Sequence, residues 1–524
     1  MGIYLNPGNE GFQSALRSQI YVDKTEMLEY TNSVLDTEQR YLCVSRPRRF
    51  GKSVTAEMLT AYYDRSCDSS ELFKGRKIAE KEGYEQHRNQ YDVLHMDIHS
   101  FRNQTSDTKG IVAVLQKAAI EELKECYPEC FAEDISQLSF ALSQINKING
   151  KKFVIIIDEW DAVFREDKYD AKVQKEYIAF LQSLFKDAPS KKFVKLAYLT
   201  GILPIKKYGT ESALNNFDEF TMLEPDVLAE YVGFTEAEVR ELYEKYHMDF
   251  EKARRWYDGY KLGDGLHIYN PKSVVDSIRR KRIGNYWTNT ETYESLKSYI
   301  NMNFDGLKDA VTKMLAGDAC TVNPAKFQND MTSFKSKDDI LTLLVHLGYL
   351  SYDADCQKVF IPNEEVKSEF VNAMEDAGWE YVINAIRASD ELLKATWNMN
   401  EEAVAKGVEA VHLANTSILT YNNENSLSCV IALAYYNAMR DYTLIREMPT
   451  GKGYADVIFL PQRHSDKPAM VVELKWDQSA EGAIAQIKDK QYVKVIEAYK
   501  DNILLVGISY SKETKEHRCK IEKG

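Results

Sequence analysis

The sequence has no run that approaches 18 uninterrupted apolar residues, and its first residues, MGIYLNPGNEGF, lack a basic segment followed by an apolar one. We therefore expect a cytoplasmic chain that is neither exported nor inserted in a membrane. Glycine and proline are sparse, with 25 and 12 residues among 524, which excludes a fibrous or low-complexity chain. The chain also lacks a regular internal repeat, which excludes a solenoid.

Cysteines are few as well, and the chain has no net positive charge. The eight cysteines are scattered, and only Cys126 and Cys130 lie close together, without a second pair to complete a zinc site. We expect reduced, mostly buried thiols. The 67 basic and 80 acidic residues give a net charge of −13, which argues against a chain that coats nucleic acid by bulk electrostatics, although it does not exclude a local basic groove.

What the chain does have is an ordinary globular composition, 44% hydrophobic and 28% charged, over a length that corresponds to several domains of about 150 residues. Short apolar runs at 41–45, 91–99, 153–157 and 193–199 alternate with helical patterns. Strands separated by helices predict a parallel sheet covered on both faces. We therefore expect an α/β domain over residues 1–225.

The remaining sequence predicts two further domains. Residues 226–390 are mainly helical in pattern and predict a lid, with a winged-helix-like part where a helix at 337–347 precedes two short strands. Residues 391–524 alternate helix, two strands, helix and strand. This order predicts a compact C-terminal α/β domain.

One loop in the first domain has features of a phosphate site. Such a site needs amides turned toward the anion, a helix N-terminus, a lysine for the β- and γ-phosphates and a hydroxyl for Mg²⁺. The required residues follow the strand at 41–45 and precede a helical pattern. Arg46 stands where the general pattern has its first glycine. The arginines at 46, 48 and 49 either contact phosphate, act on the nucleotide of a neighbouring molecule, or form a solvated basic loop. The predicted nucleotide-binding residues are Arg49, Phe50, Gly51, Lys52, Ser53 and Val54.

Two acidic residues follow the apolar run at 153–157. Asp158 at the carboxyl end of a buried strand could hold Mg²⁺ together with Ser53, and Glu159 could polarise an attacking water. The alternative interpretation is a solvated acidic turn. Thr200 ends the next strand, where its hydroxyl either contacts the γ-phosphate or the attacking water, or serves as a simple turn hydroxyl.

Taken together, the motifs resemble those of AAA-ATPase-like proteins common in Bacteroidetes and Clostridia, which carry a C-terminal nuclease-like domain of the PD-(D/E)xK superfamily. The resemblance spans nearly the whole chain, and in that family an arginine also replaces the first glycine of the loop. It implies that Lys52 and Ser53 bind phosphate and Mg²⁺, that Asp158 coordinates the metal and that Glu159 activates water. The segments that carry it are YVDKT (21–25), RPRRFGKS (46–53), IDEWD (157–161), LTG (199–201), WYDGY (256–260) and IPNEE (361–365).

Three residues of the last domain suit a metal-dependent nuclease, which needs carboxylates around Mg²⁺ and a lysine that stabilises charge. Glu473 and Lys475 are two apart and so share one face of a strand, and Asp456 lies across a hairpin from them. Alternating charges also mark solvated strand faces, which is the alternative. We expect Asp456 and Glu473 to bind the metal, and both to act catalytically with Lys475.

The resemblance adds further candidates and a function. It implies a role for Tyr21 and Asp23 near the adenine or before the first strand, an acidic ligand at Glu424 or Glu447, and substrate contacts at Gln486 and Tyr492. We expect an ATP- and Mg²⁺-dependent ATPase with a nuclease domain that acts on DNA or RNA, and self-association remains open. The alternatives are a nucleotide-switched protein whose nuclease-like domain binds without cleaving, and a scaffold with vestigial sites.

Overall fold

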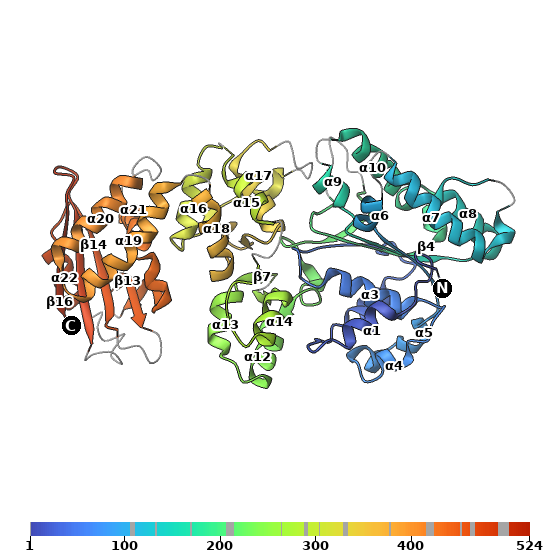
Figure 1. Ribbon diagram of the computed structural model, residues 1–524, viewed down its shortest axis with the longest axis horizontal. Helices are drawn as coiled ribbons and strands as arrows, with labels where there is room; N and C mark the ends of the chain where they lie inside the picture. Colours follow the sequence, from blue (N-terminus) through green and yellow to red (C-terminus); the bar gives the residue numbers. More distant parts are fainter. Residues whose placement is uncertain are drawn as a thin grey trace. The chain divides into compact units, whose positions relative to one another are not determined.

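The structure is a computed structural model in which internal contacts divide the chain into two compact units (Figure 1). The first unit is Met1–Thr290 with Thr321–Val366, and the second is Glu291–Cys320 with Lys367–Gly524. Among the described residues, no helix is long and apolar enough to span a bilayer. The structure describes residues 2–104, 110–131, 134–167, 170–205, 214–263, 265–287, 292–302, 304–327, 334–376, 379–415, 424–450, 453–461, 467–490 and 502–524.

A five-stranded parallel sheet in the order β2-β3-β4-β1-β5 forms the centre of the first unit. Helices α1, α3, α4 and α5 cover one face and α6 to α10 cover the other (Figure 1), which confirms the predicted parallel sheet between helices. The strands are β1 (Tyr41–Ser45), β2 (Asp92–Asp97), β3 (Phe153–Asp158), β4 (Val194–Gly201) and β5 (Asp218–Phe220). The helices are α1 (Glu10–Leu16), α2 (Met27–Ser33), α3 (Lys52–Tyr63), α4 (Ser70–Phe73), α5 (Tyr84–His87), α6 (Ile98–Gln104), α7 (Ile111–Cys126), α8 (Leu138–Asn149), α9 (Ala162–Glu166), α10 (Ala171–Phe185) and α11 (Ser190–Phe193).

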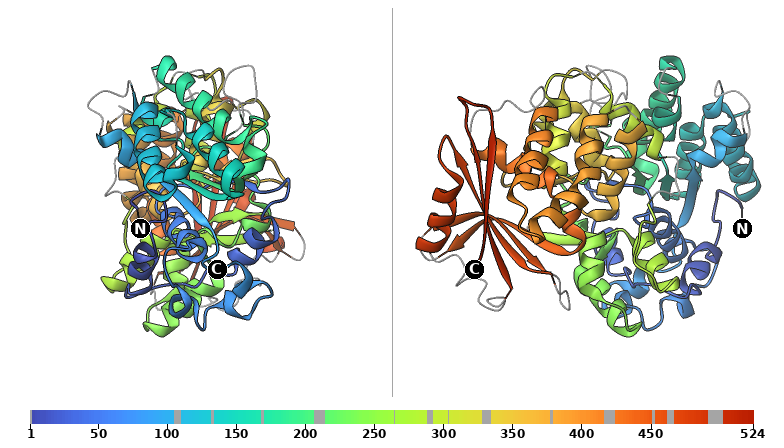
Figure 2. Two further views of the ribbon diagram at one scale, coloured as in Figure 1. Left: turned by 90° about the vertical axis from the view of Figure 1, so that its right-hand side faces the viewer. Right: turned by 60° about the vertical axis from the view of Figure 1, so that its left-hand side comes forward.

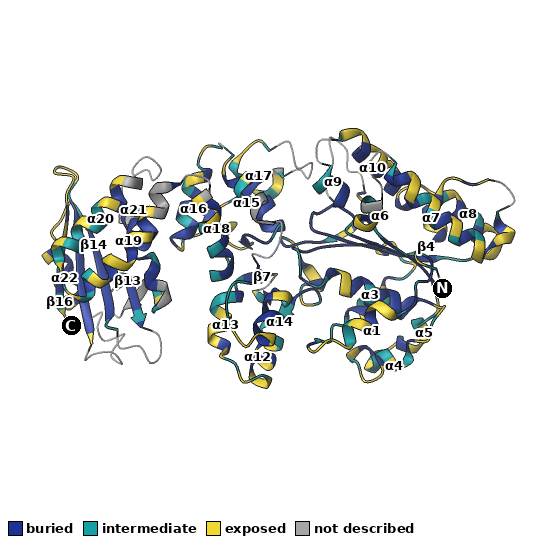
Figure 3. Cartoon of the chain, in the orientation of Figure 1, coloured by how far each residue is buried: buried dark blue, intermediate teal, exposed yellow. Residues whose placement is uncertain are grey.

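The sheet is apolar throughout its interior, as the runs of β-branched residues predict. Every residue of β1 and β3 is buried (Figure 3). One predicted strand, at 91–99, is too long, because β2 ends at Asp97. The Asp97 Oδ1 atom accepts the His99 amide at 3.0 Å and thereby favours the start of α6.

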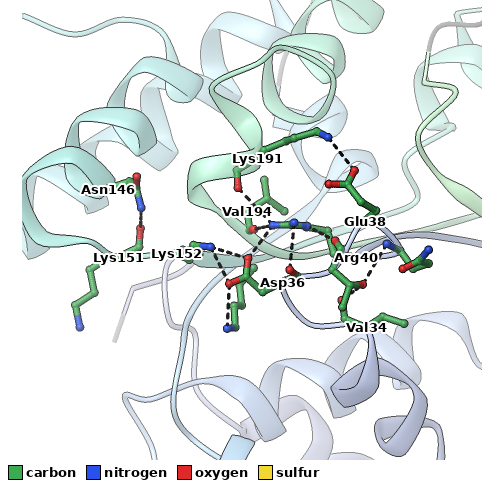
Figure 4. A network of polar contacts seen from close by, with 12 residues as sticks. Val34, Asp36, Glu38, Arg40, Asn146, Lys151, Lys152, Lys191 and Val194 are labelled. Carbon is green, nitrogen blue, oxygen red and sulfur yellow. Dashed lines mark hydrogen bonds and ion pairs between the residues drawn. The ribbon is translucent and has the colours of Figure 1, made fainter.

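At the amino ends of the strands, one carboxylate ties three strands together (Figure 4). Asp36 bonds Arg40 just before β1 at 2.9 Å and Lys152 just before β3 at 2.6 Å, and lies 3.7 Å from Lys195 of β4. The buried Arg40 guanidinium also donates to the Val194 carbonyl at 3.0 Å. This end of the sheet is therefore locked by charge pairs, while the carboxyl ends lie at the opposite edge.

The middle of the chain is mainly helical with small hairpins, as predicted. The helix and hairpin expected over 337–362 are present, because α17 is followed by antiparallel β10 and β11. The elements are β6 (Phe234–Thr235), α12 (Glu236–Lys245), α13 (Phe250–Tyr257), β7 (Tyr260–Leu262), β8 (Leu266–Tyr269), α14 (Pro271–Arg279), α17 (Lys337–His346), β10 (Ser351–Asp353) and β11 (Lys358–Phe360) in the first unit, α15 (Thr292–Ile300) and α16 (Leu307–Leu315) in the second, and β9 (Cys320–Thr321) and α18 (Glu364–Asp376) where the chain passes between them. Short 3₁₀ turns, η1 to η5, lie at Lys77–Glu80, Pro128–Cys130, Asp226–Leu228, Pro324–Lys326 and Tyr436–Arg440.

The glycine of the WYDGY segment predicts a large stability effect. Gly259 has φ +111°, and a Cβ atom there would lie 1.9 Å from the Pro362 carbonyl oxygen. Gly265 has φ +86° with nothing within 4 Å of such a Cβ atom, so it is a matched control. We expect Gly265→Ala to cost about 1 kcal/mol of unfolding free energy, and Gly259→Ala to cost about 3 kcal/mol or more because the backbone must also move. Urea unfolding of the full chain measures both, and equal costs would contradict the packing described.

The second unit is built on a sheet in the order β12-β13-β14-β15-β16, with β14 and β15 parallel and the other neighbours antiparallel. Helix α22 packs on one face through an apolar cluster that includes Ile484, Ile487 and Val471, and α19, α20 and α21 lie on the other face (Figure 2). The elements are α19 (Glu380–Trp397), α20 (Glu401–Asn415), α21 (Glu424–Ala434), β12 (Tyr442–Thr450), β13 (Gly453–Pro461), β14 (Ala469–Trp476), α22 (Ala480–Asp489), β15 (Ile503–Tyr510) and β16 (His517–Lys523). The predicted C-terminal α/β architecture is confirmed.

A buried pair of histidines in this unit predicts acid sensitivity. His412 Nδ1 lies 3.0 Å from His517 Nε2, and burial lowers both pKa values to about 4, with the charge of His412 contributing at His517. Unfolding returns each pKa to about 6.5, so the unfolded chain binds more protons between pH 6.5 and 4. The stability due to the pair is thus complete above pH 6.5 and lost as the pH falls toward 4.

We therefore expect the denaturant concentration at the unfolding midpoint of the second unit to decrease as the pH is lowered from 7.5 to 5. The fall should be smaller in His517→Gln, since each unit of pKa shift corresponds to about 1.4 kcal/mol. Comparison with wild type removes the contribution of other titrating groups. Parallel losses in the two proteins would show that the pair does not carry the effect.

Candidate nucleotide and metal sites

The phosphate-loop segment joins β1 to α3 at the carboxyl edge of the parallel sheet. Arg49 and Gly51 have φ values of +69° and +95°, and α3 begins directly after them at Lys52. The first N–H groups of a helix have no partner within the helix and carry partial positive charge. The loop therefore has the backbone form that receives an anion.

Lys52, Ser53, Asp158 and Glu159 converge beside this helix N-terminus. The buried Lys52 Nζ atom donates to the Pro47 carbonyl at 3.1 Å and lies 3.9 Å from Glu159 Oε1. The Ser53 hydroxyl acts on the neighbouring Asp158 carboxylate and lowers its pKa. The two motifs, 106 positions apart in sequence by residue number, thus form one cluster.

Burial and charge oppose each other in this cluster. Burial raises the pKa of Asp158, while the Ser53 hydrogen bond and the charge of Lys52 lower it. Burial lowers the pKa of Lys52, while the charges of Glu159 and Asp158 raise it. Such mutual compensation is expected of groups that are placed to bind a charged ligand in a site with little water.

Glu159 leaves the end of β3 with φ +50°, an uncommon conformation for a residue with a side chain. Its amide donates to Asp158 Oδ1 at 2.9 Å, and its carboxylate pairs with Arg165 of α9. Arg165 Nε also donates to Asp161 Oδ2 at 3.0 Å, and Asp161 is fully buried. Arg165 thus links the Glu159 carboxylate to the buried Asp161 carboxylate.

Thr200 lies in register with Asp158 on β4, but its hydroxyl is used inside the sheet. The Oγ1 atom donates to the Val44 carbonyl at 3.1 Å, and the side chain is fully buried. The structure therefore places Thr200 next to the site without aiming its hydroxyl into it.

Arg46 replaces the usual loop glycine and points into the protein. Its guanidinium donates to the carbonyls of Ser45 at 3.0 Å, Phe220 at 2.9 Å and Leu228 at 3.4 Å, and the residue is fully buried. Neither a phosphate contact nor a solvated loop describes it, because it fastens the end of β1 to β5 and to the turn that follows.

The outer side of the loop packs against the helical middle of the same unit. The Phe50 ring meets the Tyr260 ring edge-on at 5.4 Å, and Asn270 Nδ2 donates to the Arg48 carbonyl at 3.5 Å. Val54, one residue past Ser53, is 44% exposed at the start of α3.

The other family segments have structural contacts. Asp23 accepts the amides of Thr25 and Lys77, both at 3.0 Å. Tyr21 lies under the Arg76 guanidinium, 5.2 Å from it. The fully hydrogen-bonded Glu365 accepts the Tyr286 amide at 2.7 Å and is 1% exposed. These contacts stabilise the packing of the first unit.

The second constellation lies on β13, β14 and α22. Glu473 and Lys475 share the face of β14 that α22 covers, with Lys475 Nζ 3.1 Å from Glu473 Oε1, and Gln486 of α22 donates to the same oxygen. Asp456 Oδ2 accepts the Leu474 amide at 2.7 Å. The structure therefore brings Asp456, Glu473, Lys475 and Gln486 together.

The carboxylates of this cluster suit a divalent cation. Burial and the charge of Asp456 raise the pKa of Glu473 to about 7. Its Oε2 atom is buried and has no hydrogen-bond partner among the residues that the structure describes. A buried orphan oxygen beside a second carboxylate fits the oxygen-ligand chemistry of Mg²⁺. The side chains of Glu424, Glu447 and Tyr492, also expected here, lie outside the described part of the chain.

A further cluster in the middle region is a charge network. Glu236, Asp258 and His267 place ligand-type atoms within 4.8 Å of one another. Arg240 bonds Glu236 at 3.0 Å, and Arg254 Nε lies 3.6 Å from Asp258. The carboxylates are thus already balanced by arginines.

The sequence motifs alone assign no role to Asp161 or Arg165. Asp161 ends the IDEWD segment and Arg165 follows it, and their spacing of four places them on one face of a helical turn. The signal was therefore present, but only the fold shows that Arg165 turns back toward Glu159.

The parallel sheet with this loop and acidic strand end defines an ATPase-like P-loop domain. Residues 10–210 match the family described as "Predicted AAA-ATPase", and residues 422–520 match the "PD-(D/E)XK nuclease superfamily". The chain therefore combines an N-terminal AAA-ATPase-like domain with a C-terminal domain of that nuclease superfamily, as its motifs indicated.

The proteins similar to this chain include the following two. One, "Uncharacterized protein in vnfD 5'region" from Azotobacter chroococcum mcd 1, is 23% identical over 522 residues, which cover 94% of this chain and 93% of the relative. The other is the Aeropyrum pernix ORC2 protein, solved as ADPNP-ADP complexes, with 10% identity, a TM-score of 0.31 and coverage of 70% of this chain and 98% of that one. A likeness that weak does not bear on function.

Proposed function

We propose that the first unit binds and hydrolyses Mg-ATP. The observation that carries this proposal is the convergence of Lys52, Ser53, Asp158 and Glu159 at the N-terminus of α3. Lys52 would exchange its Pro47 carbonyl for the β- and γ-phosphates, and the loop amides would bind the remaining phosphate oxygens. Glu159 would orient and deprotonate the attacking water.

Ser53 and Asp158 would hold the Mg²⁺ ion, whose oxygen-ligand preference fits a hydroxyl beside a carboxylate. When bound, a divalent cation neutralises phosphate oxygens at both proposed sites. In the second unit, we propose that Asp456 and Glu473 hold Mg²⁺ and that Lys475 positions the nucleophilic water for cleavage of a DNA or RNA phosphodiester. The buried Glu473 Oε2 atom supports this second part.

Two assays on the purified full chain test the proposal. ATP turnover is measured with and without Mg²⁺, and linear DNA, circular DNA and RNA are incubated with Mg²⁺ or Mn²⁺. Metal-dependent turnover supports the ATPase, and metal-dependent cleavage supports the nuclease. ATP turnover without cleavage of any substrate would favour the alternative of a nucleotide-switched protein whose second unit only binds.

A further inference from the structure

An arginine to which the sequence motifs assign no role contacts Glu159, the proposed water-activating carboxylate. Arg165, on the short helix α9, is 8% exposed at its side chain, and it contacts two carboxylates at once. One guanidinium nitrogen donates to Glu159 Oε2, while Nε donates to Asp161 Oδ2 at 3.0 Å. A planar guanidinium fixed by two acceptors has little freedom to move.

The arginine is anchored to the sheet through Asp161. The Oδ2 atom of Asp161 also accepts the amides of Ile202 at 3.1 Å and Leu203 at 2.9 Å, directly after β4. Asp161 is fully buried, and Gly201 has no side chain, which leaves room for it: a Cβ there would lie 2.5 Å from Asp161 Oδ1. The clamp on Glu159 is therefore held by the backbone at the end of a central strand.

The two oxygens of Glu159 face different groups. Oε2 is held by Arg165, and Oε1 lies 3.9 Å from Lys52 Nζ. Lys52 marks the place of the β- and γ-phosphates, so Oε1 is the oxygen on the side where a water would attack. A base oriented by a third group is a recurring arrangement in catalysis.

We propose that Arg165 is a positioning residue for ATP hydrolysis, which clamps one oxygen of Glu159 so that the other is directed at the attacking water. The inference rests on the proposed ATPase function. In the reaction, Glu159 accepts a proton from the water as the water oxygen bonds to the γ-phosphorus. The bond from that phosphorus to the bridging oxygen breaks, and its electron pair leaves with ADP.

The test separates positioning from phosphate binding. Arg165→Gln removes the charged clamp and should lower kcat about 10- to 100-fold, with KM for ATP and the affinity for a fluorescent ATP analogue changed by less than about threefold. Arg165→Lys should restore part of kcat. In a Glu159→Gln background, Arg165→Gln should lower kcat little further, because Arg165 acts through the Glu159 carboxylate that is already absent.

Arg102→Gln is the matched control. Arg102 bonds the same short helix at Glu166, at 2.7 Å, without contacting Glu159, so its variant should keep wild-type kcat. A larger loss of ATP affinity than of kcat in Arg165→Gln, or unchanged turnover, would overturn the positioning role alone. Absence of turnover in the wild type, with ATP bound, would overturn the proposed hydrolysis and the inference with it.

Discussion

Lys52→Ala is expected to reduce ATP hydrolysis by the full chain about 10² to 10³-fold and to weaken ATP binding. Lys52 is buried at the start of α3, where it faces the Pro47 carbonyl and Glu159. In the proposed site, the Lys52 ammonium would contact the phosphates through charge-assisted hydrogen bonds, and alanine would leave their negative charge uncompensated. Steady-state turnover and binding of a fluorescent ATP analogue measure the two effects.

The control is Lys74→Ala, since Lys74 is a highly exposed lysine whose ion pair with Glu71 contributes little. It should retain wild-type turnover. Lys52→Ala also removes the cation that faces Asp158 and the Oε1 atom of Glu159, so its unfolding midpoint is measured beside its activity. A folded Lys52→Ala protein with normal ATP affinity would contradict the proposed site.

Glu473→Gln is expected to reduce metal-dependent cleavage of nucleic acid at least about 100-fold. Substitution of a residue that only hydrogen bonds to a metal ligand already lowers metal affinity or activity about 10- to 100-fold. The substitution preserves the shape of the side chain but removes the negative charge that binds a divalent cation. Asp456→Asn should act in the same way, because its carboxylate belongs to the same cluster. Gel assays with Mg²⁺ and Mn²⁺ measure the loss.

Glu481→Gln on α22 provides the control, because Glu481 is exposed in the first turn of that helix. Its cleavage rate should equal that of the wild type. ATP turnover in Glu473→Gln should also be unchanged, since Glu473 belongs to the second unit. Cleavage that persists in both Glu473→Gln and Asp456→Asn would assign the nuclease activity to a contaminant or to another site.

Much of the fold follows from the sequence because local patterns determine it. The apolar runs at 41–45 and 153–157 become β1 and β3, and the spacing of Glu473 and Lys475 places both on one face of β14. Residues 98 and 99 were expected in a strand, but Asp97 ends it by bonding the amide of His99. A side chain of one residue thus outweighed the β-type pattern around it.

The site was harder to predict where it depends on distant backbone. Arg46 was interpreted from its charge, yet its partners are carbonyls at 220 and 228, which sequence spacing does not reveal. Thr200 bonds the Val44 carbonyl for the same reason, because β4 and β1 are neighbours only in the folded sheet. Arg165 lies four residues from Asp161, but its contact with Glu159 depends on the left-handed turn at residue 159.

A crystal structure of the full chain with Mg²⁺ and a non-hydrolysable ATP analogue is the most direct test of the proposed nucleotide site. We expect the terminal phosphate to lie within hydrogen-bond distance of Lys52 Nζ and of the amides that open α3, with Mg²⁺ on the Ser53 hydroxyl and near Asp158. Nucleotide density elsewhere in the chain, or a triphosphate whose cation avoids both Ser53 and Asp158, would contradict it.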